Sequence, residues 1–255
     1  METFFPLMSL SELALAAAVG ILAGFIKGVV GFGMPLIFIS GLTVFMPPEL
    51  ALAGLIVPTL ATNAQQALRQ GVRAALESVR AFRVFLMVGG VAMVLCAQLV
   101  PLLPDRLMLA VIGVPVTFFA VLQLSGYSFR LSRRTPRSEA AAGIVAGSMG
   151  GLSGNWGAPT VAYLTALDTQ KHDQMRIQGV IYGLGAVVLV LAHTTSGVLR
   201  AETIGFSVAM VPTAFMGMWV GMAVMDRIDQ AAFRRATLFV LIAVGLNLIR
   251  RAVVG

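Results

Sequence analysis

The chain has 255 residues, of which 58% are apolar and 11% are charged, and its formal net charge is +7 at pH 7. Soluble domains carry about 25% charged residues, so this composition excludes an ordinary water-soluble fold. The positive charge does not indicate nucleic-acid binding, because the arginines stand in short clusters between apolar segments and no basic face is interleaved with aromatic residues.

Apolar stretches of membrane-spanning length recur along the whole chain. The N-terminus carries Glu2 and no nearby lysine or arginine, so it does not resemble a cleaved signal peptide. The stretches are continuously apolar rather than alternating, and a spanning helix needs ~20 residues, which together predict an all-α polytopic membrane protein instead of a β-barrel. The expected spans are 50–68, 84–100, 106–125, 177–198, 203–225 and 236–249.

The first interruption of the apolar pattern reads GFIKGVVGFGMP over residues 24–35, between apolar stretches at 10–23 and 36–46. It holds four glycines and Pro35. Relative to alanine, each glycine costs a helix about 1 kcal/mol and a proline about 3, so we expect irregular backbone there. Lys27, in the same segment, is either an anion ligand or a lysine that reaches out to the membrane surface.

A polar cluster lies on the next span and comprises Thr59, Thr62, Asn63, Gln65 and Gln66. Such groups either form hydrogen bonds between helices or line a polar site. We include Asn63 and Gln66 among the candidate site residues.

The second half of the chain repeats this organisation. The segment GSMGGLSGNWGAP at 147–159 follows an apolar stretch at 139–146 and precedes another at 160–167. Three of its glycines match glycines of the first segment at a constant offset of 123 residues, and a Gly-x-Pro triplet follows in both. We therefore predict a duplication, with an N-terminal repeat at 1–127, a basic linker at 128–138 and a C-terminal repeat at 139–255.

Each glycine-rich segment is expected to form a broken helical hairpin that returns to the side from which it entered, followed by three transmembrane helices. The second repeat is then inverted relative to the first, an arrangement typical of secondary transporters. The loops at 69–83, 126–138, 168–176 and 226–235 carry 13 of the 18 lysines and arginines, and the opposite face carries four. By the positive-inside rule the larger set is cytoplasmic, so both termini are expected to be periplasmic.

The half-helices that follow the breaks are expected to begin near Pro35 and Pro159, and a helix N-terminus attracts anions. Two inverted hairpins would point two such N-termini at one place, and Lys27 adds a full positive charge to it. We expect no catalytic residue, metal ligand or cofactor. The candidate substrate-binding residues are Lys27, Gly28, Gly31, Phe32, Gly33, Pro35, Asn63, Gln66, Ser153, Gly154, Asn155, Trp156, Gly157, Pro159 and Gln178.

The two copies of a glycine-rich break, a proline and an apolar half-helix resemble the sulfite exporter TauE/SafE family of membrane permeases over nearly the whole chain. The resemblance implies a permease of the bacterial cytoplasmic membrane that moves sulfite, sulfonates such as sulfoacetate, or other small organic anions. It places the binding region at the glycine-rich breaks. Many relatives have a longer glycine-rich run at the first break, so Lys27 and Phe32 are local departures that we expect to tune substrate choice.

Energetics agree with anion export, because an inside-negative potential drives negative charge outward by about 2.3 kcal/mol per charge per 100 mV. We expect no buried Asp or Glu within the spans, and therefore no carboxylate proton relay. No P-loop is present, so ATP-driven transport would need a separate subunit. The partners expected are a small anion and the lipid bilayer, with no nucleic acid and with a homodimer as an open possibility.

Two other functions stay open. An anion channel could use the same hairpins. An intramembrane serine protease is suggested by GLSG at 151–154, because Ser153 and His193 could form a nucleophilic pair. The corresponding tetrapeptide of the first copy, GVVG, has no serine, which favours a small residue in a break over a nucleophile. We therefore expect a transporter rather than an enzyme.

Overall fold

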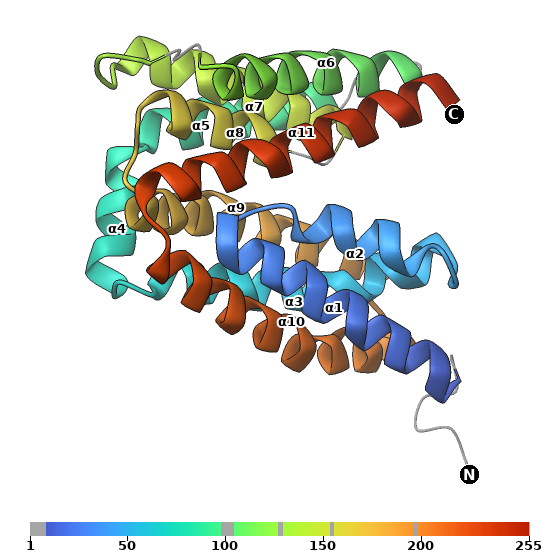
Figure 1. The fold of residues 1–255 in the computed structure, drawn as a ribbon. Helices are drawn as coiled ribbons and strands as arrows, with labels where there is room; N and C mark the ends of the chain where they lie inside the picture. The colour runs from blue at the N-terminus through green and yellow to red at the C-terminus, as the bar shows by residue number, and fades with distance from the viewer. Residues whose placement is uncertain (1–8, 98–104, 127–129, 154–155, 196–197, 255) are drawn as a thin grey trace. The chain divides into compact units, whose positions relative to one another are not determined.

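The computed structural model of the chain describes residues 9–97, 105–126, 130–153, 156–195 and 198–254. These residues form eleven α-helices and no β-strand, which confirms the all-α prediction (Figure 1). Within the described ranges, three helices are long and apolar enough to cross a membrane: α1 (Leu10–Val30), α10 (Ala201–Arg227) and α11 (Gln230–Val254). The pair α4 (Val72–Ala81) and α5 (Arg83–Ala97), bent by 69° at their junction, makes a fourth candidate if it counts as one span.

The predicted spans correspond closely to helices. The remaining six helices are α2 (Met34–Leu42), α3 (Pro48–Leu68), α6 (Asp105–Leu124), α7 (Pro136–Ser153), α8 (Gly157–Ala166) and α9 (Lys171–Thr195). Four of the predicted spans agree with a helix to within a few residues. The other two helices are longer than predicted: α9 begins at Lys171 instead of 177, and α11 extends beyond the predicted 236–249 at both ends.

The segment 69–83, expected to be a loop, contains the ten-residue helix α4. Its residues fall on distinct faces: Ala75 and Ser78 are buried, whereas Val72 and Leu76 are exposed. Spacings of three and four residues place each of these pairs on one side of a helix. The loop prediction was wrong because it relied on the arginines as a sign of a loop and overlooked the helical spacing of the apolar and small residues.

Contacts divide the chain into two compact units, each built from both halves of the sequence. The first unit comprises Met1–Gly71 and Gly179–Ile228, and the second comprises Val72–Gln178 and Asp229–Gly255. The first unit therefore combines α1, α2 and α3 with most of α9 and with α10. The predicted repeats, 1–127 and 139–255, do not coincide with these packing units.

In the first unit, α1 and α2 form an antiparallel pair (Figure 1). A Cβ atom placed on Gly41 of α2 would lie 2.7 Å from the Val19 side chain of α1. Nearer the other end of α2, the Phe38 ring lies 3.6 Å from the position of a Cβ on Gly20. The chain thus turns back on itself after α1.

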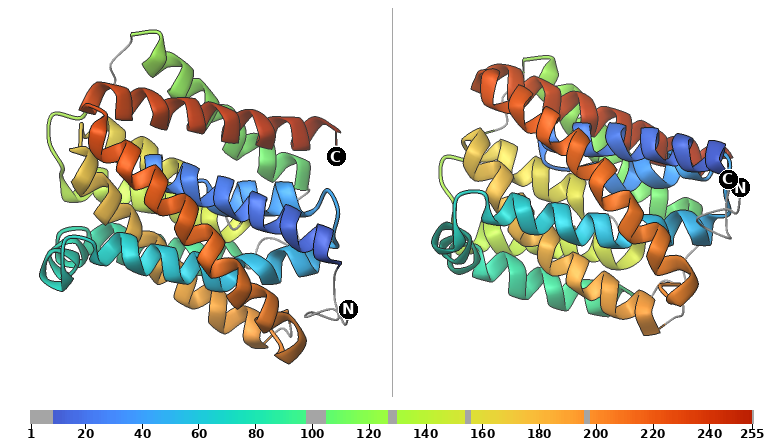
Figure 2. Two further views of the ribbon diagram at one scale, coloured as in Figure 1. Left: turned by 60° about the horizontal axis from the view of Figure 1, so that its bottom comes forward. Right: turned by 90° about the horizontal axis from the view of Figure 1, so that it is seen from below.

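The helices α3 and α10 pack against each other and run in the same direction (Figure 2). Near their N-terminal ends, Arg200 donates to Glu49 at 2.7 Å. At their C-terminal ends, Arg69 donates to Asp226 at 2.6 Å. Two ion pairs therefore join the helices, one at each end.

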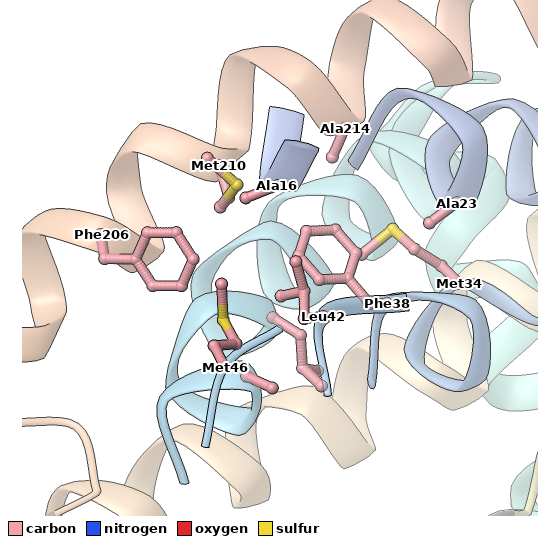
Figure 3. Close-up of a cluster of buried hydrophobic side chains, with 11 residues drawn as sticks. Ala16, Ala23, Met34, Phe38, Leu42, Met46, Phe206, Met210 and Ala214 are labelled. Carbon is pink, nitrogen blue, oxygen red and sulfur yellow. The ribbon is translucent and has the colours of Figure 1, made fainter. Parts of the chain in front are cut away.

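An apolar core holds α1, α2, α3 and α10 together (Figure 3). On the buried side of α2, Met34, Phe38 and Leu42 recur every fourth residue, and Met46 continues the row beyond the helix. This spacing aligns the three side chains of α2 on one face, and Met46 joins the same cluster from the turn that follows. The other members of the core are Ala16, Ala23, Ala51, Leu55, Phe206, Met210 and Ala214.

The second unit contains α4 to α8, the start of α9 and α11. The helices α5 and α7 are parallel and meet at glycines, since a Cβ on Gly147 would lie 2.0 Å from the carbonyl oxygen of Gly89. The helices α6 and α11 are antiparallel and meet at Gly113 and Gly245 (Figure 2). Close helix packing at small residues is typical of membrane proteins, where no hydrophobic driving force pulls helices together.

Candidate functional site

The chain between α1 and α2 leaves helical geometry only at residues 31–33. Gly31 and Gly33 both have φ of +86°, a left-handed conformation that favours glycine. The Gly31 amide donates to the Lys27 carbonyl oxygen at 2.7 Å and closes the C-terminus of α1. Phe32 is buried between the two glycines. Pro35 is the second residue of α2.

The expectation of irregular backbone across 24–35 was wrong for most of that stretch, because Gly24 and Gly28 lie inside α1. A Cβ on Gly24 would lie 2.1 Å from the Ala214 carbonyl oxygen of α10, and one on Gly28 would lie 2.3 Å from that of Met218. These glycines therefore allow two helix backbones to touch. The packing gained offsets their unfavourable helix propensity, which the sequence alone could not show.

Lys27 lies in the last turn of α1 and is 2% exposed. Its ammonium donates a hydrogen bond to the Asn63 Oδ1 atom of α3. The C-terminal end of a helix carries partial negative charge, which favours a cation in its last turn. The side chain does not extend to the surface of the unit. Lys27 is therefore a buried amino group held at the end of a helix.

The polar residues of α3 follow a helical period and form one buried face. Thr59, Thr62, Asn63 and Gln66 are all buried, and their spacing of three and four residues aligns them. The Gln66 Nε2 atom donates to the Gly31 carbonyl oxygen at 3.1 Å. The predicted residues Lys27, Gly31, Asn63 and Gln66 are thus brought together around the end of α1.

The other members of this face are bonded locally or have no partner. Thr62 donates to the Pro58 carbonyl oxygen at 2.6 Å, within α3 itself. The hydroxyl of Thr59 is buried and has no hydrogen-bond partner among the described residues. A buried hydroxyl without a partner costs free energy, so a polar face of this kind is suited to accept a ligand group.

No carboxylate balances the charge of Lys27 among the described residues. The nearest acids along the packed helices, Glu49 and Asp226, lie at helix ends and pair with arginines. In the part of the chain that the structure describes, no three His, Cys, Asp or Glu side chains gather as a metal site would need. A lysine ammonium has three donors, of which Asn63 accepts one.

The end of α1 stops short of the end of α10. Gly28 lies against Met218 and Gly221, whereas α10 continues to Arg227. The six residues of α10 that follow Gly221, 222–227, span roughly 9 Å at 1.5 Å per residue. Asn63, the partner of Lys27, stands six residues before Arg69, and Gln66, the partner of Gly31, stands three before it. Lys27 therefore lies a little under about two helical turns from the Arg69–Asp226 end, and the 31–33 turn lies about one turn from it.

The second glycine-rich segment belongs to the second unit. Here α7 ends at Ser153 and α8 begins at Gly157, so Pro159 is the third residue of α8. Trp156 packs beside Gly150, where a Cβ would lie 3.1 Å from that of Trp156. The Trp156 carbonyl oxygen accepts from the Thr160 hydroxyl at 2.8 Å. Gly154 and Asn155 lie outside the described residues.

The remaining predicted residues are not joined to Lys27 by the structure. Gln178 is fully buried and belongs to the second unit, whereas Lys27 belongs to the first. The side chains of Ser153 and His193, the pair of the protease alternative, lie outside the described part of the chain.

Glu139 is a buried acid that the sequence analysis missed. It is 4% exposed and lies in the first turn of α7. It accepts from the Phe85 amide in the first turn of α5 at 3.1 Å, and the Arg134 guanidinium lies 3.8 Å away. The prediction of no buried Asp or Glu concerned the expected spans, and this acid at the start of α7 lies outside them. Thr135 and Pro136 mark an expected helix start, and Glu139 follows Pro136 by three residues. The sequence therefore indicates an acid in a first helical turn, but it does not show that the acid is buried.

Comparison with protein families gives one match. The family model described as Sulfite exporter TauE/SafE covers residues 16–248. The matched range begins within α1 and ends within α11, so it includes both glycine-rich segments. Searches of curated proteins and of solved structures gave no match.

Proposed function

This chain belongs to the sulfite exporter TauE/SafE family of membrane permeases, and we propose that it exports sulfite, a sulfonate or a related small organic anion. The family's members are transporters rather than enzymes, which agrees with the expectation from the sequence. The proposal places the bound anion next to Lys27, at the turn between α1 and α2.

The observation that carries this proposal is the burial of Lys27 without an acidic partner among the described residues. The side chain is 2% exposed and faces the Asn63 amide rather than an acid. Burying an ammonium without a counter-charge is costly, so a site of this kind gains free energy when an anion enters it. A cation would meet the opposite effect and be repelled.

Each neighbouring residue has a proposed part in binding. Asn63 orients the Lys27 side chain, since its Oδ1 atom accepts from the ammonium. Gln66 holds the Gly31 carbonyl oxygen at 3.1 Å and so fixes the turn. Gly33 and Pro35 shape the N-terminal end of α2, whose free amides favour negative charge. Gly28 brings α1 close to α10, and Phe32 excludes water.

We also propose that the second glycine-rich segment takes part in anion binding, through Ser153, Gly154, Asn155, Trp156, Gly157, Pro159 and Gln178. The glycine pattern from which the inverted repeats were predicted supports this proposal. Gly20 and Gly24 of α1 pack on α10, and Gly143 and Gly147 of α7, at the same offset of 123, pack on α5. Equivalent glycines thus make equivalent close contacts in the two units.

The distribution of basic residues supports a cytoplasmic-membrane topology with both termini periplasmic. In the second unit, α6 and α11 are antiparallel, so Arg106 lies at the same end as Arg250 and Arg251. In the first unit, Arg200 and Arg69 lie at opposite ends of the α3–α10 pair. Both arrangements agree with the predicted division of positive charge between the two faces.

The proposal is tested by anion flux into proteoliposomes for sulfite, sulfoacetate, acetate and chloride, with wild type beside Lys27→Met. Loss of a charged hydrogen bond costs about 1.5–3 kcal/mol, or roughly 10- to 100-fold in affinity, so the variant should transport far less at low concentration. The matched control is Lys171→Met, which removes the chain's other lysine, at the start of α9. Equal transport by all three proteins would contradict the proposed site.

The same vesicles separate a carrier from a channel. A carrier exchanges anions, so unlabelled anion inside the vesicles should accelerate entry of labelled anion. A channel shows no such acceleration.

The homodimer that the sequence analysis left open is tested by the mass of the purified protein in detergent.

A further inference from the structure

A buried lysine that binds an anion is left without a counter-charge once the anion has gone, and burying such a charge is costly. Lys27 is joined to Asn63 through an N–H donor. A neutral amine carries N–H donors as an ammonium does, so this hydrogen bond forms in either protonation state. The one described contact of the side chain therefore does not require a charge.

Beyond the partial negative charge at the C-terminal end of α1, the described residues of the elements around Lys27 place no full counter-charge beside it. The helix α2 contains no ionisable residue. On α3 and α10 the charged residues lie at the ends, and on α9 the titratable residues of the first unit are Tyr182, a neutral phenol, and His193, whose side chain lies outside the described part. The acid of α1 itself, Glu12, is fifteen positions away in its first turn. The charged end residues are Glu49, Arg69, Glu202, Asp226 and Arg227.

We propose that Lys27 takes up a proton together with the anion, and that the two cross the membrane as one neutral unit. This inference rests on the proposed function. In the empty site the side chain is a neutral amine that donates to Asn63. A proton and a monoanion then enter from the same side, and the ammonium and the anion form a neutral pair. On the other side both leave, and the neutral amine is restored.

Glu139 shows how this chain holds a buried charge that stays in place. That carboxylate has the Phe85 amide at 3.1 Å and the Arg134 guanidinium at 3.8 Å. The guanidinium supplies positive charge and the amide supplies a hydrogen-bond donor, so both partners of the carboxylate are residues of the chain. Lys27 has no counterpart to them, so the anion is the partner that its protonated form lacks.

Coupling of this kind changes what drives transport. A neutral unit does not respond to the membrane potential, which differs from the potential-driven uniport expected from the sequence. The direction of transport then depends on the product of the anion and proton concentrations on each side, and export proceeds when this product is larger inside. An anion produced inside the cell leaves whenever its own gradient exceeds the opposing proton gradient.

The experiment measures the final accumulation of anion in proteoliposomes at fixed potential and fixed pH difference. The probes are sulfite and methanesulfonate, and methanesulfonate stays ionised near neutral pH and cannot itself carry a proton. A uniporter of a monoanion accumulates it roughly 50-fold when a potassium gradient with valinomycin makes the interior 100 mV positive. Proton coupling predicts no accumulation from the potential, and about tenfold accumulation of methanesulfonate when the exterior is one pH unit more acidic.

The outcomes separate the two proposals. Accumulation that follows the potential and ignores the pH difference overturns proton coupling and leaves the proposed function standing. Entry of neither probe, nor of any other anion of the flux panel, overturns both. Lys27→Arg adds a second readout, because a guanidinium remains charged and should make transport depend on the potential. If this variant does not fold, the wild-type measurement decides by itself.

Discussion

Replacing Gly28 with alanine tests whether α1 and α10 touch through their backbones. A Cβ on Gly28 would lie 2.3 Å from the Met218 carbonyl oxygen and 2.9 Å from the Cα atom of Gly221. Ordinary contacts of this type lie beyond about 3.4 Å, so the helices must separate by about 1 Å. The atoms in the way belong to the backbone and cannot move aside by changing rotamer.

The expected loss of stability follows from two opposing effects. Overpacking costs typically 1–3 kcal/mol, and a backbone clash belongs at the upper end of that range. Alanine regains about 1 kcal/mol of helix propensity. The net destabilisation expected for Gly28→Ala is therefore about 1–2 kcal/mol. In a protein of this size, that lowers the midpoint of thermal unfolding by roughly 2–8 °C.

The matched control is Gly90→Ala in α5, where an added Cβ meets no atom within 4 Å. This variant keeps the gain in helix propensity without the clash, so its unfolding midpoint should stay unchanged or rise. Thermal unfolding of both variants in detergent, followed by intrinsic fluorescence, makes the comparison. If Gly28→Ala proves as stable as Gly90→Ala, the close contact between α1 and α10 is wrong.

Three further predictions follow from contacts within single units. Glu139→Gln keeps an acceptor for the Phe85 amide of α5 and should be tolerated, whereas Glu139→Ala should lower the free energy of unfolding by about 1–3 kcal/mol. In the same thermal assay, the control Glu77→Ala at an exposed acid should change it by less than about 0.5 kcal/mol. A double-mutant cycle of Arg69→Ala and Asp226→Ala should give a coupling free energy of about 0.2–1 kcal/mol that falls with added salt. A coupling of zero would show that this ion pair does not stabilise the contact between α3 and α10. Asn63→Leu should weaken anion transport at low concentration more than at saturation, since Asn63 orients Lys27; an unchanged concentration dependence would speak against that role.

Much of the fold could be predicted because the apolar segments are long and continuous. The span 50–68 became α3 and the span 203–225 became α10, each to within two residues. The glycine-rich segment misled because a glycine penalises an isolated helix, while in this chain Gly24 and Gly28 permit contact with α10. That distinction depends on a neighbour nearly 200 residues away in the sequence, which a local reading cannot supply.

The candidate site could be predicted in part. An isolated lysine in an apolar chain pointed to Lys27, and the period of Asn63 and Gln66 on α3 pointed to a shared face. The contact between Lys27 and Asn63 depends on α1 and α3 both packing against α2 and α10, which brings the two side chains within reach. Glu139 was missed for the same reason: its position predicts an acid in a first helical turn, but its burial depends on the start of α5.

The most direct test of the account is the thermal stability of the purified protein against sulfite, sulfate, thiosulfate, sulfoacetate, acetate and chloride, with Lys27→Met and Lys171→Met alongside. A ligand at 100 times its Kd stabilises the native state by about 2.7 kcal/mol, which raises the unfolding midpoint by roughly 5–10 °C. The account predicts that a sulfur oxyanion or sulfonate stabilises wild type and Lys171→Met but not Lys27→Met. An equal response in Lys27→Met, or no response to any anion in wild type, would contradict an anion site at Lys27.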